Sequence, residues 1–397
     1  MKEELKIRFL SDLVDFKNGK SIKPSSGNIP IYGGNGILGY SEKYNYDNIL
    51  IIGRVGAYCG SIHYHKEKCW VSDNAIAGEV KSDYSIDYLY YLMKSLNLND
   101  RQVGSSQPLL TQGVLNNISV KIYESSQTQQ SIAAILSALD KKIALNKQIN
   151  ARLEEMAKTL YDYWFVQFDF PDANGKPYKS SGGEMVFDET LKREIPKGWE
   201  VKSLGEVITH STTGLNPRDN FSLGNGENFY VTIKNIKDNE IKFHTCAKIT
   251  DEALNVINKR SKLDKGDILF TSIEPIGSTY LLHEKPKNWD INESVFSIRS
   301  KSDFITPYFL FMLLSSDEIK SFTRQVSTGS VHKGIRHESL KRFTFAYSGI
   351  DLIKNFTNLI SPMQQNIFFL QKQNHHLTQL RDFLLPMLMN GQVSVAE

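Results

Sequence analysis

The sequence contains the same succession of short patterns twice, about 220 positions apart. Each copy has a short apolar run bounded by turn residues, an aromatic-rich segment, and an apolar stretch that leads into a long helical segment. The three matched pairs are Asn48–Gly53 with Gly266–Thr271, Asp87–Met93 with Pro307–Leu313, and Leu115–Val120 with Leu340–Phe345. The order is the same both times, so the sequence indicates a tandem duplication of a unit of roughly 200 residues. Such a unit is too long for a solenoid repeat and long enough for a domain followed by a helix.

The segment that closes each copy has a heptad repeat of apolar residues. In the first copy the two tracks are Ile132, Leu139, Asn146, Leu153, Leu160 and Ile135, Lys142, Ile149, Met156, Tyr163. In the second copy they are Phe356, Met363, Leu370, Leu377, Leu384 and Leu359, Asn366, Gln373, Leu380, Met387. These are the a and d positions of a coiled coil, sustained over several heptads. Forty residues of helix are ~60 Å long at ~1.5 Å per residue, which is longer than a small domain is wide.

The simplest arrangement pairs the two helices of one chain, antiparallel, as a rod between two globular domains. The alternative is that each helix is amphipathic and lies on its own domain. Polar residues on the tracks, such as Asn146, Asn366 and Gln373, would fix the register of a coiled coil at a cost in stability. Ser361–Gln364 has the pattern of a helix start, with Pro at the first helical position and Gln at N3.

Composition excludes several classes of protein. The formal net charge is +3, from 47 Lys and Arg against 44 Asp and Glu, whereas nucleic-acid-binding domains often carry a strong basic excess. The longest apolar run, Pro307–Leu314, is shorter than the ~18–20 residues of a membrane span. The charged N-terminus lacks the apolar core of a secretory signal, and three cysteines are too few for a disulfide framework. These features predict a cytoplasmic protein with no membrane contact.

Two glycine motifs resemble phosphate-binding sequences but lack their context. Gly34–Gly39 fits G-x-G-x-x-G, yet a dinucleotide site needs this run between a strand and a helix, with an acidic residue ~20 positions on. Pro30 upstream and Tyr40–Tyr46 downstream favour a glycine loop instead. Gly19–Ser21 resembles the end of a phosphate loop, but position 14 is Val where the motif has its first glycine.

Patterns for metal binding and catalysis are equally weak. Cys59–Cys69 contains two Cys and, at His63 and His65, two His that an extended hairpin would place on one face, but the spacing is not a usual zinc spacing. Asp219 and Glu240–Lys242 have the residue types of a metal-dependent nuclease, in a pattern that arises easily by chance. An adenine or cytosine methyltransferase would need a turn such as Asn-Pro-Pro-aromatic, and no two prolines are adjacent. The sequence therefore predicts no catalytic residues and no metal site.

Positive charge is concentrated in one stretch of the second copy. Between positions 319 and 342 there is a single acidic residue, Glu338. The same stretch contains six basic residues, Lys320, Arg324, Lys333, Arg336, Lys341 and Arg342, with His332 and His337 nearby. Thr328–Gly334 is a flexible polar loop within this stretch, and Arg101–Gln107 is the corresponding, less basic loop of the first copy. Lys and Arg would hold DNA phosphates, while Arg, Asn, Gln, Ser and His read base edges. The alternative interpretation is an ordinary solvated charged face.

Stretches spread over the whole chain share motifs with one known family. They are Pro30–Tyr40, Gln129–Asn150 continuing to Tyr163–Asp169, Gly175–Met185, Ile195–Glu200 and Leu384–Gly391. Together they resemble the specificity subunit of type I restriction–modification systems: a first-domain loop, the central helical region, the start of the second recognition domain and the end of the C-terminal helix. The family often has Pro-Pro before each helix, whereas here Tyr123–Ser126 and Tyr347–Ile350 stand in those places.

The repeat and the resemblance together predict an α+β fold. It has two tandem α/β target-recognition domains separated by two long helices, which form an antiparallel intramolecular coiled coil with pseudo-two-fold symmetry. The expected boundaries are 1–125 for the first target-recognition domain, 126–168 for the central helix, 169–198 for a linker, 199–348 for the second target-recognition domain and 349–397 for the C-terminal helix and tail.

The resemblance implies a non-catalytic, DNA-reading subunit of a complex that methylates adenine N6 and restricts DNA. Each domain would read one half of a bipartite, asymmetric site in double-stranded DNA. The paired helices would set the spacing of the halves and dock two methyltransferase subunits. S-adenosylmethionine, ATP and Mg would be bound by the methyltransferase and restriction/translocase partners, with no cofactor bound by this chain.

Residue type and loop position select the residues that we expect near DNA. In the first domain they are Asn35, Arg54, Ser105, Ser106 and Gln107, and in the second Asn216, Arg218, Arg324, Ser330, His332, Lys333 and Arg336. Three other functions stay open: a coiled-coil scaffold that never touches DNA, a metal-dependent nuclease, and the DNA-reading subunit of a related system that has a fused nuclease–methyltransferase.

Overall fold

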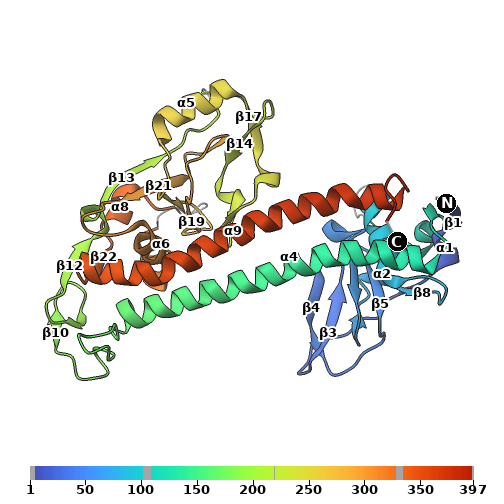
Figure 1. Cartoon of the computed structure of the whole chain (residues 1–397), viewed down its shortest axis with the longest axis horizontal. Helices are drawn as coiled ribbons and strands as arrows, with labels where there is room; N and C mark the ends of the chain where they lie inside the picture. The colour runs from blue at the N-terminus through green and yellow to red at the C-terminus, as the bar shows by residue number, and fades with distance from the viewer. Residues whose placement is uncertain (1–4, 102–108, 219, 328–333, 396–397) are drawn as a thin grey trace. The chain divides into compact units, whose positions relative to one another are not determined.

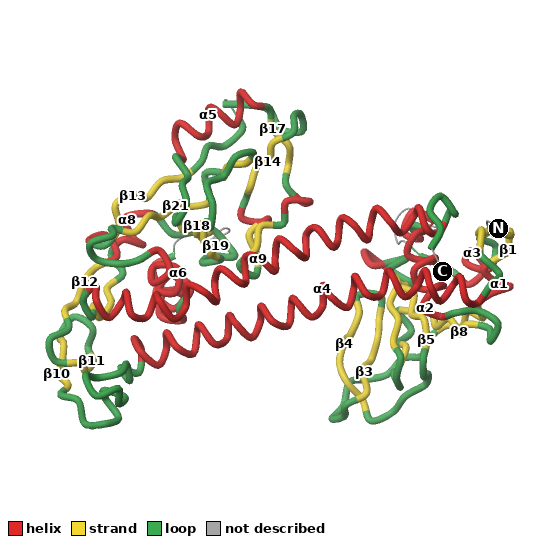
Figure 2. Tube along the Cα trace, viewed as in Figure 1, coloured by secondary structure: helices red, strands yellow, loops and turns green. Residues whose placement is uncertain are grey.

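A computed structural model describes residues 5–101, 109–218, 220–327 and 334–395. The chain divides into two compact units, Met1–Asn146 with Gln373–Glu397 and Lys147–Lys372. We call these the first unit and the second unit. Each contains sheets with short helices, together with part of each of two long helices, α4 and α9 (Figures 1 and 2).

The strands of the first unit form two sheets and a separate ribbon. The four-stranded sheet has the order β2-β8-β5-β6, the three-stranded sheet has the order β4-β3-β7, and β1 pairs with β9. The strands are β1 Lys6–Phe9, β2 Val14–Asn18, β3 Ile29–Gly33, β4 Gly36–Ser41, β5 Ile49–Gly53, β6 Ile62–His65, β7 Trp70–Val71, β8 Ala75–Val80 and β9 Ser119–Ile122. The short helices are α1 Leu10–Leu13, α2 Ile86–Ser95 and α3 Gln112–Asn116.

The second unit has the same arrangement with additions. Its sheets have the orders β13-β21-β18-β19 and β17-β14-β20, and β12 pairs with β22; the pairs β10–β11 and β15–β16 are extra. The strands are β10 Met185–Asp188, β11 Arg193–Pro196, β12 Glu200–Ser203, β13 Ile208–Thr213, β14 Asn228–Val231, β15 Ile236–Lys237, β16 Glu240–Ile241, β17 Ala247–Ile249, β18 Ile268–Thr271, β19 Thr279–Leu281, β20 Trp289–Ile291, β21 Val295–Ser300 and β22 Thr344–Tyr347. The short helices are α5 Asp251–Ser261, α6 Pro307–Ser315, α7 Asp317–Val326 and α8 His337–Lys341.

The sheets of the two units correspond in the register that the sequence repeat predicts. At the end of β5, Gly53 pairs with Ala75, and at the end of β18, Thr271 pairs with Val295. The partner strand has an equivalent place in each sheet: β8 lies between β5 and β2, and β21 lies between β18 and β13. The α+β fold with two tandem domains is therefore confirmed, and the repeat can be used to align the units position by position.

Alternation along the central strand explains where the cores lie. All five residues of β5 are buried, and successive side chains of a strand point to opposite faces. Leu50 and Ile52 join the core that α2 and α3 cover, whereas Ile49 and Ile51 join a second core between the two sheets. A continuous apolar run of this kind is expected for a strand buried on both faces.

The two long helices, α4 Ser126–Tyr161 and α9 Ile350–Met389, run antiparallel within each unit. In the first unit Asn146 Nδ2 donates to Gln373 Oε1 at 2.7 Å, and Arg381 Nη1 donates to Asp140 Oδ1 at 2.7 Å. In the second unit Asn150 Nδ2 is 3.4 Å from the Ile367 carbonyl oxygen. Rising numbers on α4 thus meet falling numbers on α9, as the predicted coiled coil requires.

The structure corrects one track of each heptad pattern. The tracks that begin at Ile132 and Phe356 lie along the packed side, but the second tracks are displaced by one residue. They are Leu136, Ile143, Asn150 and Ala157 on α4, and Ile353, Ile360, Ile367 and Asn374 on α9. Residues of the predicted tracks are instead exposed: 52% for Met156, 47% for Leu359 and 45% for Leu380. The second track can lie three or four residues after the first and still repeat every seven residues, so the sequence pattern does not choose between these spacings. Packing against the opposing helix makes the choice.

The predicted helix start at Ser361 is also wrong. Helix α9 begins at Ile350 and continues through Pro362, which is exposed on the helix surface. A proline in a helix interior removes one hydrogen bond, here to the carbonyl four residues earlier. The packing of Phe356, Ile360 and Ile367 in the core keeps the helix continuous across that position.

Residues 169–198, expected as a linker, contain a hairpin, and they pack with neighbouring residues in an aromatic group. After a π-helical turn, Asp162–Val166, the chain forms hairpin β10–β11 (Figure 2). Phe168 and Ile195 are buried against Ala346 of β22, and Phe170 stacks on Trp199 with ring centroids 5.2 Å apart. Within the described ranges, no helix is long and apolar enough to cross a membrane.

Candidate nucleic-acid interface

Three segments meet at the end of the four-stranded sheet of the first unit. The segment after β5 begins with Arg54, whose N–H donates to the Asn74 carbonyl oxygen at 3.0 Å. The Arg54 carbonyl oxygen accepts from Leu110 N–H at 2.9 Å. The turn between β7 and β8 and the segment that leads into α3 are therefore tied to Arg54 by backbone hydrogen bonds.

The side chain of Arg54 is half-buried at this sheet end and has spare donors. Its Nη1 is 3.5 Å from the Asp73 carbonyl oxygen, and its buried Nε has no hydrogen-bond partner among the described residues. No described carboxylate forms an ion pair with it. A guanidinium held in this way can donate to a phosphate or to a guanine edge, as predicted for DNA contact.

Asn35 lies beside Arg54, at the exposed tip of hairpin β3–β4. Two side chains of the segment 54–65 hold this tip at its Gly34 carbonyl oxygen: Ser61 Oγ at 2.5 Å and His63 Nε2 at 3.0 Å. The hairpin tip and the end of β5 approach so closely that Gly53 has no room for a side chain and Gly34 has little. A Cβ on Gly53 would be 2.0 Å from the Tyr58 carbonyl oxygen, and one on Gly34 would be 3.1 Å from the Gly53 Cα. The glycine run 34–39 is thus part of a hairpin, as the sequence indicates, and not the start of a helix.

The same sheet end recurs in the second unit with different side chains. Ser272 occupies the position of Arg54: its N–H donates to the Ser294 carbonyl oxygen at 2.9 Å and its carbonyl oxygen accepts from Ile335 N–H at 2.8 Å. Its hydroxyl donates to the same Ser294 oxygen at 2.8 Å. Sequence reasoning missed Ser272, although the aligned repeat, with Gly53 matched to Thr271, already identified it as the counterpart of Arg54.

Asn216 and Arg218 begin the segment that follows β13 at this same end. Asn216 is half-buried and its carbonyl oxygen accepts from Asn220 Nδ2 at 3.0 Å, whereas Arg218 is exposed. The preceding Gly214 touches the β20–β21 turn so closely that a Cβ would be 1.6 Å from the Ile291 carbonyl oxygen. The segment of Asn216 and Arg218 therefore begins beside the β20–β21 turn, which carries Ser294, the backbone partner of Ser272.

Arg336 and Arg324 are the described basic candidates on either side of the loop 328–333. Arg336 is the N-cap residue of α8, directly after Ile335, and Arg324 lies in the last turn of α7. Both are exposed, and neither forms an ion pair with a described residue. Arg336 occupies the position of Thr111, the N-cap residue of α3 in the first unit. The two arginines are free to meet phosphates, and their contact with DNA stays a prediction.

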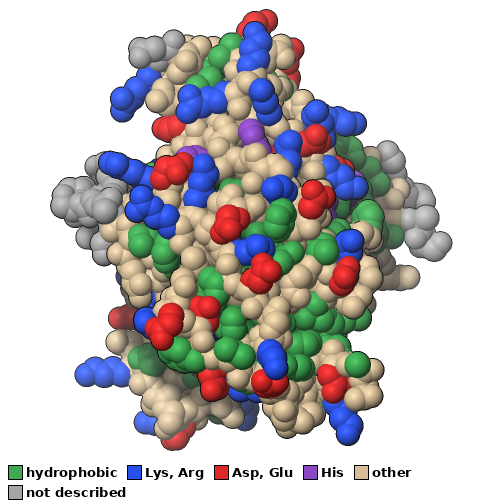
Figure 3. Space-filling model, turned by 90° about the vertical axis from the view of Figure 1, so that its left-hand side faces the viewer, with side chains coloured by type: hydrophobic (Ala, Val, Ile, Leu, Met, Phe, Trp, Pro, Cys, Tyr) green, Lys and Arg blue, Asp and Glu red, His purple; other side chains and the backbone are tan. Residues whose placement is uncertain are grey.

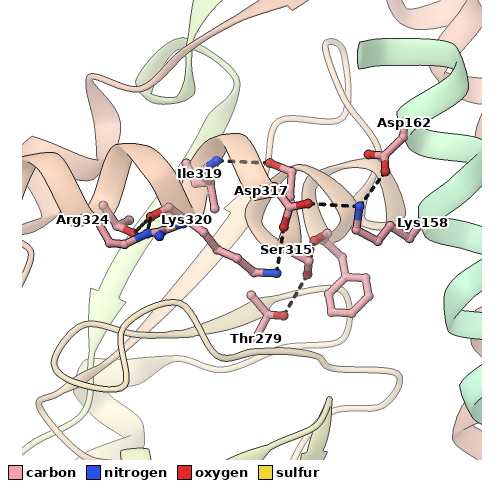
Figure 4. A network of polar contacts seen from close by, with 11 residues as sticks. Lys158, Asp162, Thr279, Ser315, Asp317, Ile319, Lys320 and Arg324 are labelled. Atoms are coloured by element: carbon pink, nitrogen blue, oxygen red, sulfur yellow. Dashed lines mark hydrogen bonds and ion pairs between the residues drawn. The ribbon is translucent and has the colours of Figure 1, made fainter. Parts of the chain in front are cut away.

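The basic stretch is less positive than its sequence suggests. Lys341 pairs with Glu338 at 2.9 Å, and Lys320 pairs at 3.4 Å with Asp317, a carboxylate just outside the stretch. Figure 4 shows that Asp317 also binds Lys158 of α4, at 3.2 Å, which in turn binds Asp162 at 2.6 Å. This network anchors the start of α7 on α4, so Lys320 has a structural role while Arg324 extends beyond it.

One face of the molecule shows side chains of both charges (Figure 3). On the face in Figure 3, Lys and Arg gather toward the upper part with Asp and Glu among them, and apolar side chains are more frequent toward the lower part. Positive and negative side chains are thus mixed on this face, in keeping with the near-neutral net charge of +3.

Six of the predicted DNA contacts lie outside the described residues. They are Ser105, Ser106 and Gln107 in the first unit, and Ser330, His332 and Lys333 in the second. The first described residue after each of these two loops forms an equivalent β-bridge: Leu109 with Val55 in the first unit, and Gly334 with Ile273 in the second.

His337 of α8 packs against strands β21 and β13 near this sheet end of the second unit. Its ring stacks on Phe296 with centroids 3.7 Å apart, and its Nδ1 is 2.5 Å from Ser211 Oγ. Burial, with Lys341 nearby, lowers the pKa of His337 to about 4. The imidazole is therefore neutral near pH 7 and adds no charge for DNA, but it orients α8 and its N-cap Arg336.

The four possible zinc ligands of the first unit have separate contacts. Cys59 and Cys69 belong to two different cores, while His63 and His65 bond to the Gly34 carbonyl oxygen and to Tyr32 Oη. Burial raises the pKa of Cys69 to about 12, which opposes the thiolate that a metal needs. Across the described ranges no three His, Cys, Asp or Glu are grouped to hold a metal ion.

The nuclease pattern is not assembled in the described residues either. Glu240 pairs with Lys242 through a short contact between Oε2 and Nζ, and Asp219 lies outside the described residues.

A family model described as "Type I restriction modification DNA specificity domain" matches residues 2–155 and 196–347. The chain belongs to this family. The two matched regions each include one of the duplicated domains, which confirms the resemblance seen in the sequence motifs.

Curated relatives agree with this family assignment. The MjaIX type I restriction enzyme specificity subunit of Methanocaldococcus jannaschii is 26% identical over 334 residues, 78% of this chain and 70% of the relative. The HindI specificity subunit of Haemophilus influenzae is 24% identical over 348 residues, 72% of this chain and 71% of the relative. A crystal structure of a type I restriction–modification S subunit from M. genitalium is 15% identical, covers 98% of this chain and 96% of its own, and has a TM-score of 0.65. That likeness establishes a common fold.

Proposed function

We propose that this specificity-family chain is the non-catalytic subunit that selects the DNA sequence for a type I restriction–modification complex. Each recognition domain reads one half of a bipartite, asymmetric site in double-stranded DNA. The observation that carries this proposal is the repeated sheet end. The backbone scaffold is equivalent in both units, but the side chains at equivalent positions differ. Arg54 of the first unit corresponds to Ser272 of the second, and Thr111 corresponds to Arg336. Equivalent scaffolds with unlike side chains suit two different half-sites.

The side chains at the sheet ends have the chemistry for both kinds of contact. Arg324 and Arg336, exposed and without ion pairs to described residues, are suited to phosphates. Arg54 and Asn35, at the hairpin side of the first unit, are suited to guanine and adenine edges. We expect these residues to position and specify, with no covalent chemistry carried by this chain.

The long helices provide the spacing and the docking surface in this proposal. Beyond the packed tracks, α4 and α9 expose large apolar side chains: Leu145 is 50% exposed, Phe369 63% and Phe383 59%. Exposed apolar groups on a structured helix are typical of a partner interface. We propose that two methyltransferase subunits dock there, and that S-adenosylmethionine, ATP and Mg are bound by the methyltransferase and restriction/translocase subunits.

The DNA-contact assignment is tested with arginine variants in the methyltransferase complex. Loss of a base contact, expected for Arg54→Ala, should cost ~1–3 kcal/mol of binding and relax one position of the target. Loss of a phosphate contact, expected for Arg336→Ala, should weaken binding to all sequences and reduce the slope of affinity against salt by about one unit. Lys192→Ala, on an exposed pair with Glu189, is the control. Unchanged affinity and unchanged salt slope in both arginine variants would show the assignment to be wrong.

The spacing role is tested by shortening both helices by one heptad. A seven-residue deletion keeps the packed faces aligned, so the complex should assemble and recognise the same half-sites with a different gap. Methylome sequencing of a host that carries the variant with its partners gives the gap directly. An assembled complex with an unchanged target would exclude the helices as the spacer. A complex that shows no sequence-specific binding of DNA would indicate that the chain is only a scaffold.

A further inference from the structure

The internal repeat extends to a two-stranded ribbon at the edge of each domain. Ribbon β1–β9 of the first unit pairs Ile7 with Lys121, and ribbon β12–β22 of the second unit pairs Val201 with Ala346. Residues opposite each other in an antiparallel pair project to the same face. Ile7 and Lys121 therefore occupy one face of the first ribbon, and Val201 and Ala346 occupy the equivalent face of the second.

That face is covered in the second unit. Ala346 is 4% exposed because Phe168 and Ile195, both almost fully buried, pack against it, with Val201 and Trp199 at the edge of the cluster. The cover comes from residues 167–198, the segment that precedes the ribbon. It is fastened by an ion pair of Arg193 with Glu318 at 2.9 Å and by the Arg193 guanidinium over the Phe168 ring at 5.1 Å.

The equivalent face of the first unit has no cover among the described residues. Ile7 is 65% exposed, the highest value of any large apolar side chain in the described ranges, and Phe9, two residues along on the same face, is 51% exposed. The residues after α9 pack elsewhere: Val395 contacts the core of the first unit, and Gly391 approaches Leu5 and the Tyr123 hydroxyl.

The other face of the first ribbon is packed against the domain. Val120 and Ile122 are buried in the core. Lys6 and Arg8 both pair with Glu124, which satisfies the two cations at that side. On the bare face Lys121 is exposed and has no ion pair with a described residue, in the place where the covered ribbon has Ala346. The occupant of this face should therefore combine apolar contact with a carboxylate.

We propose that Ile7, Phe9 and Lys121 form a docking surface for a segment of the methyltransferase subunit that carries an aromatic side chain flanked by an acidic residue. The segment covers this ribbon as Phe168 and Ile195 cover its counterpart. Apolar side chains at the centre of the face favour a protein occupant over DNA, whose contacts are largely polar and charged. The inference rests on the proposed function, because that function supplies the methyltransferase as the direct partner.

The test measures the affinity of the full chain for its methyltransferase subunit by titration without DNA. The double variant Ile7→Ser with Phe9→Ser should bind about tenfold or more weakly, as expected for loss of central apolar contacts. The charge variant Lys121→Glu keeps the apolar pair and should also bind more weakly, because it opposes the acidic residue. The matched control is Val186→Ser with Phe187→Ser, an apolar pair on strand β10 that is 48% and 55% exposed, and it should bind like the parent.

Each outcome decides the proposal. Parental affinity in both the double variant and Lys121→Glu overturns it, and an equal loss in the control shows that the effect is not specific to this face. If the chain alone dimerises in sedimentation and the double variant abolishes the dimer, the occupant is a second copy and the proposal is wrong. If the parent chain itself fails to bind the methyltransferase, the proposed function fails as well. Because the substituted side chains are exposed, the thermal unfolding of each variant should match the parent, and Lys121→Glu keeps the test decisive if the double variant does not fold.

Discussion

Asp140 joins three helices of the first unit, and its removal should uncouple the recognition domain from the long helices. Its Oδ2 accepts from the Tyr91 hydroxyl of α2 at 2.8 Å, and its Oδ1 accepts from Arg381 Nη1 of α9 at 2.7 Å. Tyr91 is 3% exposed, while the Asp140 and Arg381 side chains are 26% and 22% exposed. Burial and the bond to Asp140 raise the pKa of Tyr91, so its hydroxyl stays a donor at any pH used for assay.

The cost of Asp140→Ala follows from the two contacts. A partly exposed ion pair is worth ~0.5–1 kcal/mol, and a buried hydroxyl that loses a charged acceptor costs ~1.5–3 kcal/mol. We expect a total of ~2–4 kcal/mol. Tyr91→Phe removes the donor and leaves Asp140 paired with Arg381, so it should cost ~1 kcal/mol. The two changes share one bond, and a double-mutant cycle should give a coupling energy of ~1–2 kcal/mol.

Hydrogen exchange of the peptide that covers α2, Ile86–Ser95, is the suitable assay. The chain has two compact units, so local opening of one unit is better defined than a single unfolding midpoint. Glu189→Gln, in an exposed ion pair of the second unit, should leave α2 protection unchanged. If Asp140→Ala shifts α2 opening by less than about 0.5 kcal/mol, or if the two changes add without coupling, the reasoning is refuted.

Four further changes test other parts of the structure. Burial lowers the pKa of His337 to about 4, so the unfolded chain takes up the proton first and stability falls as the pH drops from ~6.5 to ~4; His337→Gln should flatten this fall in urea midpoints. Burial raises the pKa of Asp290 to about 6, so the folded chain takes up this proton first and gains stability as the pH falls from 6 to 4. Asp290→Asn removes this gain, so the stability of the variant should fall more steeply over that range. Asn146→Leu should raise the unfolding free energy by ~1 kcal/mol, since its buried Oδ1 has no partner among described residues, but extra species should appear in sedimentation because the helix register is less specific. Gly214→Ala should cost ~3 kcal/mol or more in thermal unfolding, because its Cβ would lie 1.6 Å from the Ile291 carbonyl oxygen.

The internal repeat could be predicted from the sequence in full register. Asn48–Gly53 and Gly266–Thr271 align in space as they do in the sequence, because a fully apolar strand between turn residues has one favourable place, at the centre of a sheet. The class of site was also predictable in part. Asn35, Arg54 and Arg336 lie where the repeat and the turn residues place loops, at one sheet end of each domain.

Side-chain partners could not be predicted, because they come from segments distant in sequence. Lys320 looked available for DNA, yet it pairs with Asp317, a carboxylate that also binds Lys158 of α4. Local spacing allows the Lys320–Asp317 pair, three residues apart, to be predicted, but not the bond from Asp317 to Lys158, which lies more than 150 positions earlier. The sequence repeat aligns Ser272 with Arg54, but Ser272 is uncharged and was not selected as a candidate. The structure adds that both residues form the same two backbone hydrogen bonds.

The duplication, the mixed fold class and the two long helices follow from the spacing of apolar residues, because strands and helices have backbone periods of two and of about 3.6 residues. Tertiary structure alone decided which second track of each helix is buried, Leu136–Ala157 rather than Ile135–Met156. It also decided that Phe168 and Ile195 cover one ribbon while Ile7 and Phe9 leave the other bare. Both possible tracks keep a seven-residue spacing, and the cover of a ribbon depends on the position of a segment more than 100 residues away in the sequence. Only the close packing of the folded chain distinguishes these alternatives.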